Sequence, residues 1–138
     1  MHKFDLKNKT AVITGGAQGF GLDIAKKFLS SGSKVFIWDI DEKELLKASK
    51  EINNSNLKYN VVDVSNFDQV HKTVNDIIVN NKIDILINNA GITGPTAELW
   101  NYNIKDWNSI ININLHGTFY CCKSIVPHMI KNNYGRIV

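Results

Sequence analysis

The 138-residue sequence has few cysteines, little excess charge of one sign and no long apolar run. Cys121 and Cys122 are adjacent, and neighbours that close do not easily form a disulfide with each other. We therefore expect two buried free thiols in a reducing compartment. The net charge of +3 comes from 16 basic and 13 acidic side chains scattered along the chain, which excludes a basic nucleic-acid-binding surface.

Signals for secretion, membrane insertion and metal binding are also missing from the sequence. No window has the uninterrupted apolar length of a membrane-spanning helix, and residues 1–9 alternate in charge where a signal peptide would be apolar. The four histidines, His2, His71, His116 and His128, share no metal-ligand spacing. The sequence predicts a cytoplasmic protein without a membrane anchor or a metal centre.

What the sequence does contain is one repeated pattern, in which short apolar runs alternate with longer segments of helical period. The runs are rich in β-branched residues and occupy residues 10–14, 34–39, 59–62, 84–88 and 135–138. The helical segments occupy residues 22–31, 41–52, 65–80 and 104–131. Asp41 and Glu44 have capping-box spacing, and Ser65 is the predicted N-cap of the third helix.

This alternation predicts the fold class. Continuous apolar runs are typical of strands buried on both faces, and strands that alternate with helices form right-handed βαβ crossovers. We expect one α/β domain over residues 1–138, a doubly wound parallel sheet between two helical layers. The fifth strand is expected to be truncated where the sequence stops.

The segment 104–131 differs from the other helices because its apolar residues cover more than one face. A helix of this kind is buried on both sides. One side is expected to pack on the sheet, and the other to contact further chain or a partner subunit. We therefore expect a homo-oligomer that forms through helix 104–131.

Glycines are concentrated between the first run and the first helical segment. Gly15, Gly19 and Gly21 lie in the sequence TGGAQGFG. Glycine permits the tight turn and the close approach of a pyrophosphate, whose charge then faces the free N–H groups of a helix. Ordinary turn chemistry is the alternative. The spacing is GxxxGxG rather than GxGxxG, and the absence of GxxxxGK(S/T) excludes a P-loop.

Polar residues lie at the ends of three more of the apolar runs. In a parallel sheet these are the carboxyl ends of the strands, where open α/β sheets bind ligands. Asp39 closes the second run, about twenty residues after the loop, where a carboxylate can bind an adenosine ribose. A carboxylate there repels a 2′-phosphate, and Gln18 and Ile40 offer no compensating cation, so NAD is favoured over NADP. Asp63 precedes Val64, and residues 88–91 read Asn-Asn-Ala-Gly; a helix cap and a turn are their structural alternatives.

The chain resembles the N-terminal part of a classical short-chain dehydrogenase/reductase, over essentially its whole length. The resemblance rests on the TGxxxGxG loop at residues 14–21, Asp39, the Asp63–Val64 pair, the Asn-Asn-Ala-Gly block at residues 88–91, and Trp107 with residues 113–115. It implies a Rossmann-like three-layer αβα fold with the strand order 3-2-1-4-5, and hydride transfer between NAD(P) and an alcohol or carbonyl substrate. The order of apolar blocks is similar to that in 3-oxoacyl-acyl-carrier-protein reductases and sugar dehydrogenases.

The resemblance also implies a set of cofactor-binding positions. They are Gly15, Ala17, Gln18, Gly19, Phe20, Gly21, Asp39, Ile40, Asp63, Val64, Asn89, Ala90, Gly91 and Ile113.

One catalytic position is implied in the same way. Asn114 matches an asparagine that holds a water of the family's proton relay. A buried amide within an apolar helix is costly without hydrogen-bond partners, which gives this position a physical reason to be functional. A kink or a cap in the helix is the structural alternative.

The departure from the family pattern concerns the proton donor. No Tyr-x-x-x-Lys occurs, and the sequence stops before the position of the family's catalytic serine. We therefore expect an NAD-dependent oxidoreductase fragment that is inactive alone. The alternative is a catalytically inactive nucleotide-binding or interaction module that uses helix 104–131. Methyl transfer from S-adenosylmethionine at the same sheet edge is disfavoured by residues 88–91 and Asn114.

Overall fold

The computed structural model describes residues 5–138 and contains a five-stranded parallel sheet with the order β3-β2-β1-β4-β5. The strands are β1 (Thr10–Thr14), β2 (Lys34–Asp39), β3 (Leu57–Val61), β4 (Ile85–Ile87) and β5 (Arg136–Ile137). The α-helices are α1 (Gly19–Ser30), α2 (Glu42–Ile52), α3 (Phe67–Ile78), α4 (Ile104–Ile111) and α5 (Gly117–Lys131). The predicted Rossmann-like fold and its strand order are confirmed.

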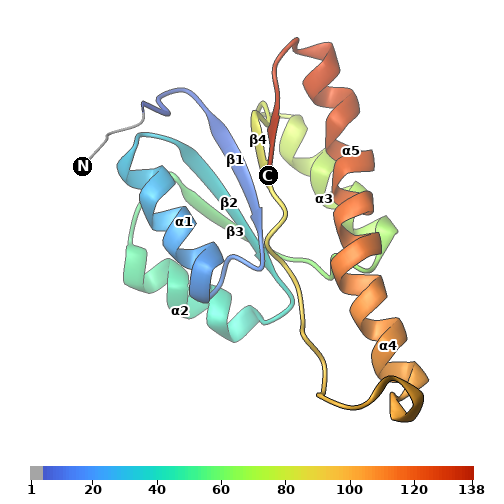
Figure 1. Cartoon of the computed structure of the whole chain (residues 1–138). Helices are drawn as coiled ribbons and strands as arrows, with labels where there is room; N and C mark the ends of the chain where they lie inside the picture. The colour runs from blue at the N-terminus through green and yellow to red at the C-terminus, as the bar shows by residue number, and fades with distance from the viewer. Residues whose placement is uncertain (1–4) are drawn as a thin grey trace.

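The sheet separates two helical layers, α1 with α2 on one face and α3 with α5 on the other (Figure 1). Each strand supplies both layers because successive side chains point to opposite faces. In β1, Ala11 and Ile13 pack toward α1 and α2, whereas Val12 packs toward α3 and α5. All three are fully buried, as expected for a strand at the centre of a parallel sheet.

Element boundaries differ from the predicted ones by a few residues. The first helix begins at Gly19, inside the glycine loop, and the third strand begins at Leu57. The fourth strand, Ile85–Ile87, is shorter than its apolar run, which extends one residue further at each end. Hydrophobic periodicity does not register such ends, which depend on where backbone pairing stops.

The predicted helix caps are partly correct. Asp41 caps α2, accepting hydrogen bonds from the N–H groups of Lys43 and Glu44. The reciprocal half of the capping box is absent, because the N–H of Asp41 donates to Asp39 Oδ1 at 3.2 Å. Ser65 as the cap of α3 was wrong: Asn66 accepts from the N–H of Gln69, whereas the Ser65 hydroxyl donates to Asp63.

Residues 104–131 form one long helical stretch that a π-helical turn, Asn112–His116, divides into α4 and α5. Gly117 follows that turn where the helix passes closest to the β3–α3 segment, since a Cβ there would lie 2.8 Å from Val64 Cγ2. Within this single chain the long helix is buried on one side, and the expected contact of its other side with further chain or a partner subunit stays a prediction. One side packs on α3 and the sheet, and the other is exposed, with Ile104 77% and Leu115 60% accessible.

Two further sequence predictions have mixed outcomes. Both cysteines are free, but only Cys121 is buried; Cys122 is half-buried. Among residues 5–138, no helix is long and apolar enough to cross a membrane.

Candidate functional site

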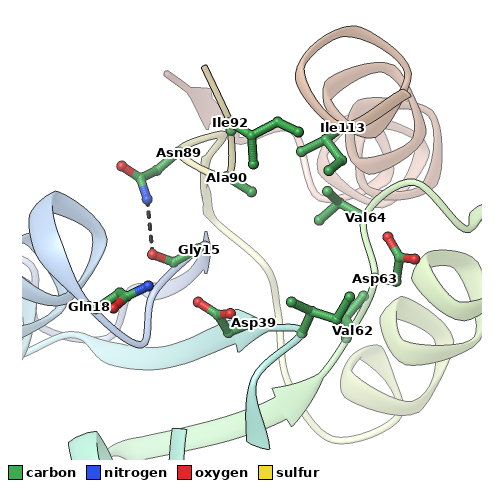
Figure 2. Close-up of a pocket in the computed structure, with 12 residues that line it drawn as sticks. Gly15, Gln18, Asp39, Val62, Asp63, Val64, Asn89, Ala90, Ile92 and Ile113 are labelled. Atoms are coloured by element: carbon green, nitrogen blue, oxygen red, sulfur yellow. Dashed lines mark hydrogen bonds between the residues drawn. The ribbon is translucent and has the colours of Figure 1, made fainter. Parts of the chain in front are cut away.

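A hollow of about 350 Å³ lies at the carboxyl ends of the strands, between the glycine loop, the end of β2, the segment after β3 and the segment after β4 (Figure 2). The described residues that line it are Gly15, Gln18, Asp39, Ile40, Val62, Asp63, Val64, Asn89, Ala90, Gly91, Ile92 and Ile113. Because consecutive parallel strands all end at this edge, segments far apart in sequence converge here.

The glycine loop presents the start of α1 to this hollow. Gln18 is the N-cap residue of α1, yet its side chain makes no capping hydrogen bond, so the first N–H groups of the helix lack a side-chain partner. Gly19 has a φ of +54°, and a Cβ on it would meet nothing within 4 Å. A Cβ on Gly21, in contrast, would collide with the carbonyl oxygen of Gly15. The loop is therefore closely packed at Gly21 and open at Gly19.

The segment after β4 holds the glycine loop in place through Thr14 and Asn89. The Thr14 hydroxyl accepts hydrogen bonds from the N–H groups of Asn89 and Ala90, both at 3.0 Å. The Asn89 amide nitrogen donates to the carbonyl oxygens of Thr14 at 2.9 Å and Gly15 at 3.0 Å, the second of which Figure 2 shows. The amide nitrogen of Asn89 thus bonds the glycine loop, while the residue also lines the hollow.

The Asp39 carboxylate stands at the rim between β2 and the glycine loop (Figure 2). Its Oδ2 accepts from the N–H of Ala17 at 3.3 Å, and its Oδ1 accepts from the N–H of Asp41 at 3.2 Å. These two donors fix the orientation of the carboxylate. Each oxygen retains a lone pair, so Asp39 can accept further hydrogen bonds from a ligand.

The wall opposite the glycine loop combines one carboxylate with apolar side chains. Asp63 Oδ1 accepts from the Ser65 N–H at 2.9 Å and from the Ser65 hydroxyl at 2.6 Å. The helix cap that the sequence left open for Asp63 is wrong, because Asn66 caps α3. Asp63 instead closes a turn with Ser65 and lines the hollow. Val62, which precedes it, is buried, and Val64 packs against the long helix at Gly117.

Asn114 lies in the π-helical turn and anchors the segment after β4. Its Oδ1 accepts from the Ile92 N–H and its Nδ2 donates to the Ile92 carbonyl oxygen, both at 2.9 Å. The cost that a buried amide without partners would carry does not arise, because Asn114 is exposed and main-chain groups satisfy its amide. π-Helical turns often occur at functional sites, and this one places Ile113 in the wall of the hollow.

The structure brings together most of the positions that the sequence singled out. Ten of the predicted cofactor-binding residues line the hollow: Gly15, Gln18, Asp39, Ile40, Asp63, Val64, Asn89, Ala90, Gly91 and Ile113. The others, Ala17, Gly19, Phe20 and Gly21, belong to the glycine loop but do not line the hollow. The predicted catalytic residue Asn114, in the π-helical turn, does not line it either. Val62 and Ile92 line the hollow without having been predicted; each is the apolar neighbour of a predicted block.

Titratable groups elsewhere form no comparable site in the described part of the chain. No three His, Cys, Asp or Glu side chains between residues 5 and 138 are placed to hold a metal ion. His2 lies outside the described residues.

Comparison with known proteins agrees with this geometry. The family model "short chain dehydrogenase" matches residues 9–138. A 2-dehydro-3-deoxy-L-rhamnonate dehydrogenase (NAD(+)) from Sphingomonas sp. is 37% identical over 131 residues, covering 94% of this chain and 52% of that protein. A 3-oxoacyl-acyl-carrier-protein reductase from Chlamydia pneumoniae is 38% identical over 136 residues, covering 96% of this chain and 54% of the reductase.

Solved structures share the architecture. A gluconate 5-dehydrogenase from Burkholderia cenocepacia, in complex with NADP and tartrate, superposes with a TM-score of 0.89 and 30% identity. The match covers 98% of this chain and 54% of the gluconate dehydrogenase. The chain thus spans about half the length of the proteins it matches. The family model covers nearly all of the chain, and the chain belongs to the short-chain dehydrogenase/reductase family.

Proposed function

We propose that the hollow at the carboxyl edge of the sheet binds NAD, and that the whole protein transfers hydride between this cofactor and an alcohol or ketone. The observation that carries the proposal is the Asp39 carboxylate, held at the rim by the N–H groups of Ala17 and Asp41 and left with free lone pairs. Near Asp39 lies the N-terminus of α1, whose first N–H groups have no side-chain cap and can bind a pyrophosphate.

The residues present fit such a cofactor. The space that a Cβ would fill at Gly19 lets a phosphate approach the N–H groups of α1. The Asp39 carboxylate can accept hydrogen bonds from ribose hydroxyls. Ile40, Val62 and Val64 supply apolar surface for an adenine ring, with Asp63 beside them as an acceptor. When bound, the nicotinamide group supplies the hydride acceptor or donor of the reaction.

The charges of the lining favour NAD over NADP. Asp39 and Asp63 are the charged residues that the described part of the chain contributes to the hollow, and neither Lys nor Arg lines it. A 2′-phosphate near Asp39 would meet a like charge without a compensating cation. The gluconate 5-dehydrogenase structure contains NADP, so the choice of cofactor differs among proteins with this fold and has to be tested for this chain.

The test is a calorimetric titration of the 138-residue chain with NAD and with NADP. We expect NAD to bind more tightly. Asp39→Asn, which removes the charge but keeps the shape, raises the Kd for NAD about tenfold or more, because hydrogen bonds to charged groups are strong. Asp23→Asn, an equal charge change on the exposed surface of α1, leaves the Kd unchanged. Equal Kd values for the wild type and the Asp39 variant would refute the proposal.

We propose that residues 1–138 form one cofactor-binding domain, and that this chain binds NAD without transferring hydride. The sequence contains no Tyr-x-x-x-Lys, so the family's proton donor and its pKa-lowering lysine are missing from it. Asn114 is the member of the family's proton relay that this chain does contain, held in position by Ile92. The relatives named above act on a sugar-acid derivative and on a carrier-bound 3-oxoacyl group, which supports an alcohol or ketone substrate.

The second candidate function is a catalytically inactive nucleotide-binding or interaction module. It is favoured by the exposed apolar side of the α4–α5 stretch. The exposed side chains are Ile104, Trp107, Leu115, Phe119 and Ile130. In either case we propose that a second copy of the protein covers this side, because large apolar surfaces that water contacts are characteristic of interfaces. The two free thiols support a reducing, cytoplasmic location.

A further inference from the structure

Two adjacent strands carry complementary buried polar atoms that make no hydrogen bond within the described part of the chain. Trp38 in β2 and Asn60 in β3 are direct partners in the strand register. The indole Nε1 of Trp38 and the amide Oδ1 of Asn60 are both buried, and neither has a hydrogen-bond partner among residues 5–138. One is a donor only and the other an acceptor only.

The two side chains lie on the same face of the sheet. Phe36 and Trp38 alternate with Val35 and Ile37 along β2, and they belong to the cluster that packs under α3 and α5. Registered residues of neighbouring parallel strands project to the same side, so Asn60 points under α3 together with Trp38. Trp38 is 0% exposed, so bulk water does not reach its N–H.

An indole N–H and an amide oxygen left unpaired in an interior are each costly. An ordered internal water commonly satisfies buried polar groups that lack a protein partner. We propose that one buried water joins Trp38 Nε1 to Asn60 Oδ1. We further propose that the pair is a positioning element for the ribose end of the NAD site, an inference that rests on the proposed function.

The backbone around the pair connects it to that site. The carbonyl oxygen of Trp38 accepts a hydrogen bond from the N–H of Gly16, in the glycine loop, at 3.0 Å. The next residue, Asp39, pairs with Val61 in the register, and its carbonyl oxygen accepts from the Val62 N–H at 2.9 Å. The backbone of Trp38 is therefore bonded directly to the glycine loop, and the residue after it carries the carboxylate at the rim of the hollow.

The first test detects the water by nuclear magnetic resonance without any cofactor. We expect the Trp38 indole proton to exchange slowly and to show a nuclear Overhauser contact with a long-lived water. The indole protons of Trp100 and Trp107, 83% and 50% exposed, exchange quickly and serve as internal controls. Asn60→Leu removes the water contact and shifts the Trp38 indole proton upfield. An absent water contact, or one that persists in Asn60→Leu, would overturn the proposal.

The second test separates positioning from stability. Asn60→Leu is expected to raise the Kd for NAD about three- to tenfold. The matched control is Lys58→Leu, which places the same side chain on the same face of β3 but beside Phe36, and leaves the Kd within about twofold. Equal effects of the two variants on Kd would refute the positioning role.

A third variant guards against simple misfolding. Trp38→Phe combined with Asn60→Leu removes both polar partners, so the double variant should be less destabilised in urea than the sum of the two single variants. Strict additivity would contradict a shared water. Failure of the wild type to bind NAD would instead refute the proposed function, while the resonance test of the water remains decisive by itself.

Discussion

At the residue scale, burial distinguishes two adjacent cysteines. Burial raises the pKa of the Cys121 thiol from 9.0 to about 12, with a smaller contribution from Cys122. The thiolate is the reactive form, so Cys121 remains protonated and unreactive at pH 8. Cys122 is half-buried beside the Asn88 amide, whose nitrogen lies 3.7 Å from its sulfur.

We therefore predict that a thiol reagent at pH 8 labels at most one cysteine of the folded chain, and that this is Cys122. Cys122→Ser should remove labelling of the folded protein, and both thiols of the wild type should react in denaturant. Mass spectrometry of the labelled peptides measures the outcome. Labelling of Cys121 in the folded Cys122→Ser variant would show that its burial is not maintained in solution.

Single residues also show which sequence predictions are robust. Asp39, the glycine loop and the Asn-Asn-Ala-Gly block follow apolar runs, and the ends of such runs converge at one sheet edge in this fold. The hydrogen bonds from Asn89 to the glycine loop depend on the spatial proximity of β1 and β4, so the sequence alone could not reveal them. For the same reason the sequence missed Val62 and Ile92, whose apolar side chains do not distinguish a pocket wall from a core.

At the scale of elements, the glycine loop separates packing from ligand access. A Cβ at Gly21 would collide with Gly15 and approach the Asn89 amide nitrogen to 2.6 Å. A Cβ at Gly19 meets open space, and alanine there has only the strain of a φ of +54°, about 1–2 kcal/mol.

We predict that Gly21→Ala lowers the free energy of unfolding more than Gly19→Ala does, by roughly 2 kcal/mol or more. Urea denaturation followed by circular dichroism measures the difference. Gly19→Ala should nevertheless weaken NAD binding, because its methyl group projects into the space proposed for the pyrophosphate. Equal losses of stability in the two variants would contradict the packing of the loop.

The elements also differ in how far the sequence defined them. All five strands were predictable because β-branched runs alternate regularly with helical segments, whereas their order followed from the family resemblance. The cap at Asn66 was not, because Ser65 and Asn66 are both good capping residues and only the backbone geometry selects one. The π-helical turn at Asn112–His116 was not predictable either, since it depends on the anchoring of Asn114 to Ile92.

At the scale of the whole molecule, the α4–α5 stretch has an exposed apolar side. We propose that two copies of the chain associate through this side. We predict that the chain associates with increasing concentration, as measured by light scattering. Leu115→Lys should shift it toward the monomer because Leu115 is 60% exposed on this side. Val79→Lys, at an exposed apolar position after α3, is the control and should change nothing.

A chain that stays monomeric at high concentration would exclude self-association through this stretch in the 138-residue protein. The same result would leave cofactor binding unaffected, because the hollow is lined by residues of one chain.

The most direct test of the account is a nuclear magnetic resonance titration of the chain with NAD, followed through its backbone amide signals. The account predicts saturable shifts at Gly15, Gly19, Asp39 and Ala90, at the carboxyl edge of the sheet, and unchanged signals at Thr10 and Lys34, where two of these strands begin. Unchanged spectra at millimolar NAD, or shifts confined to the amino-terminal edge, would contradict a cofactor site in this hollow.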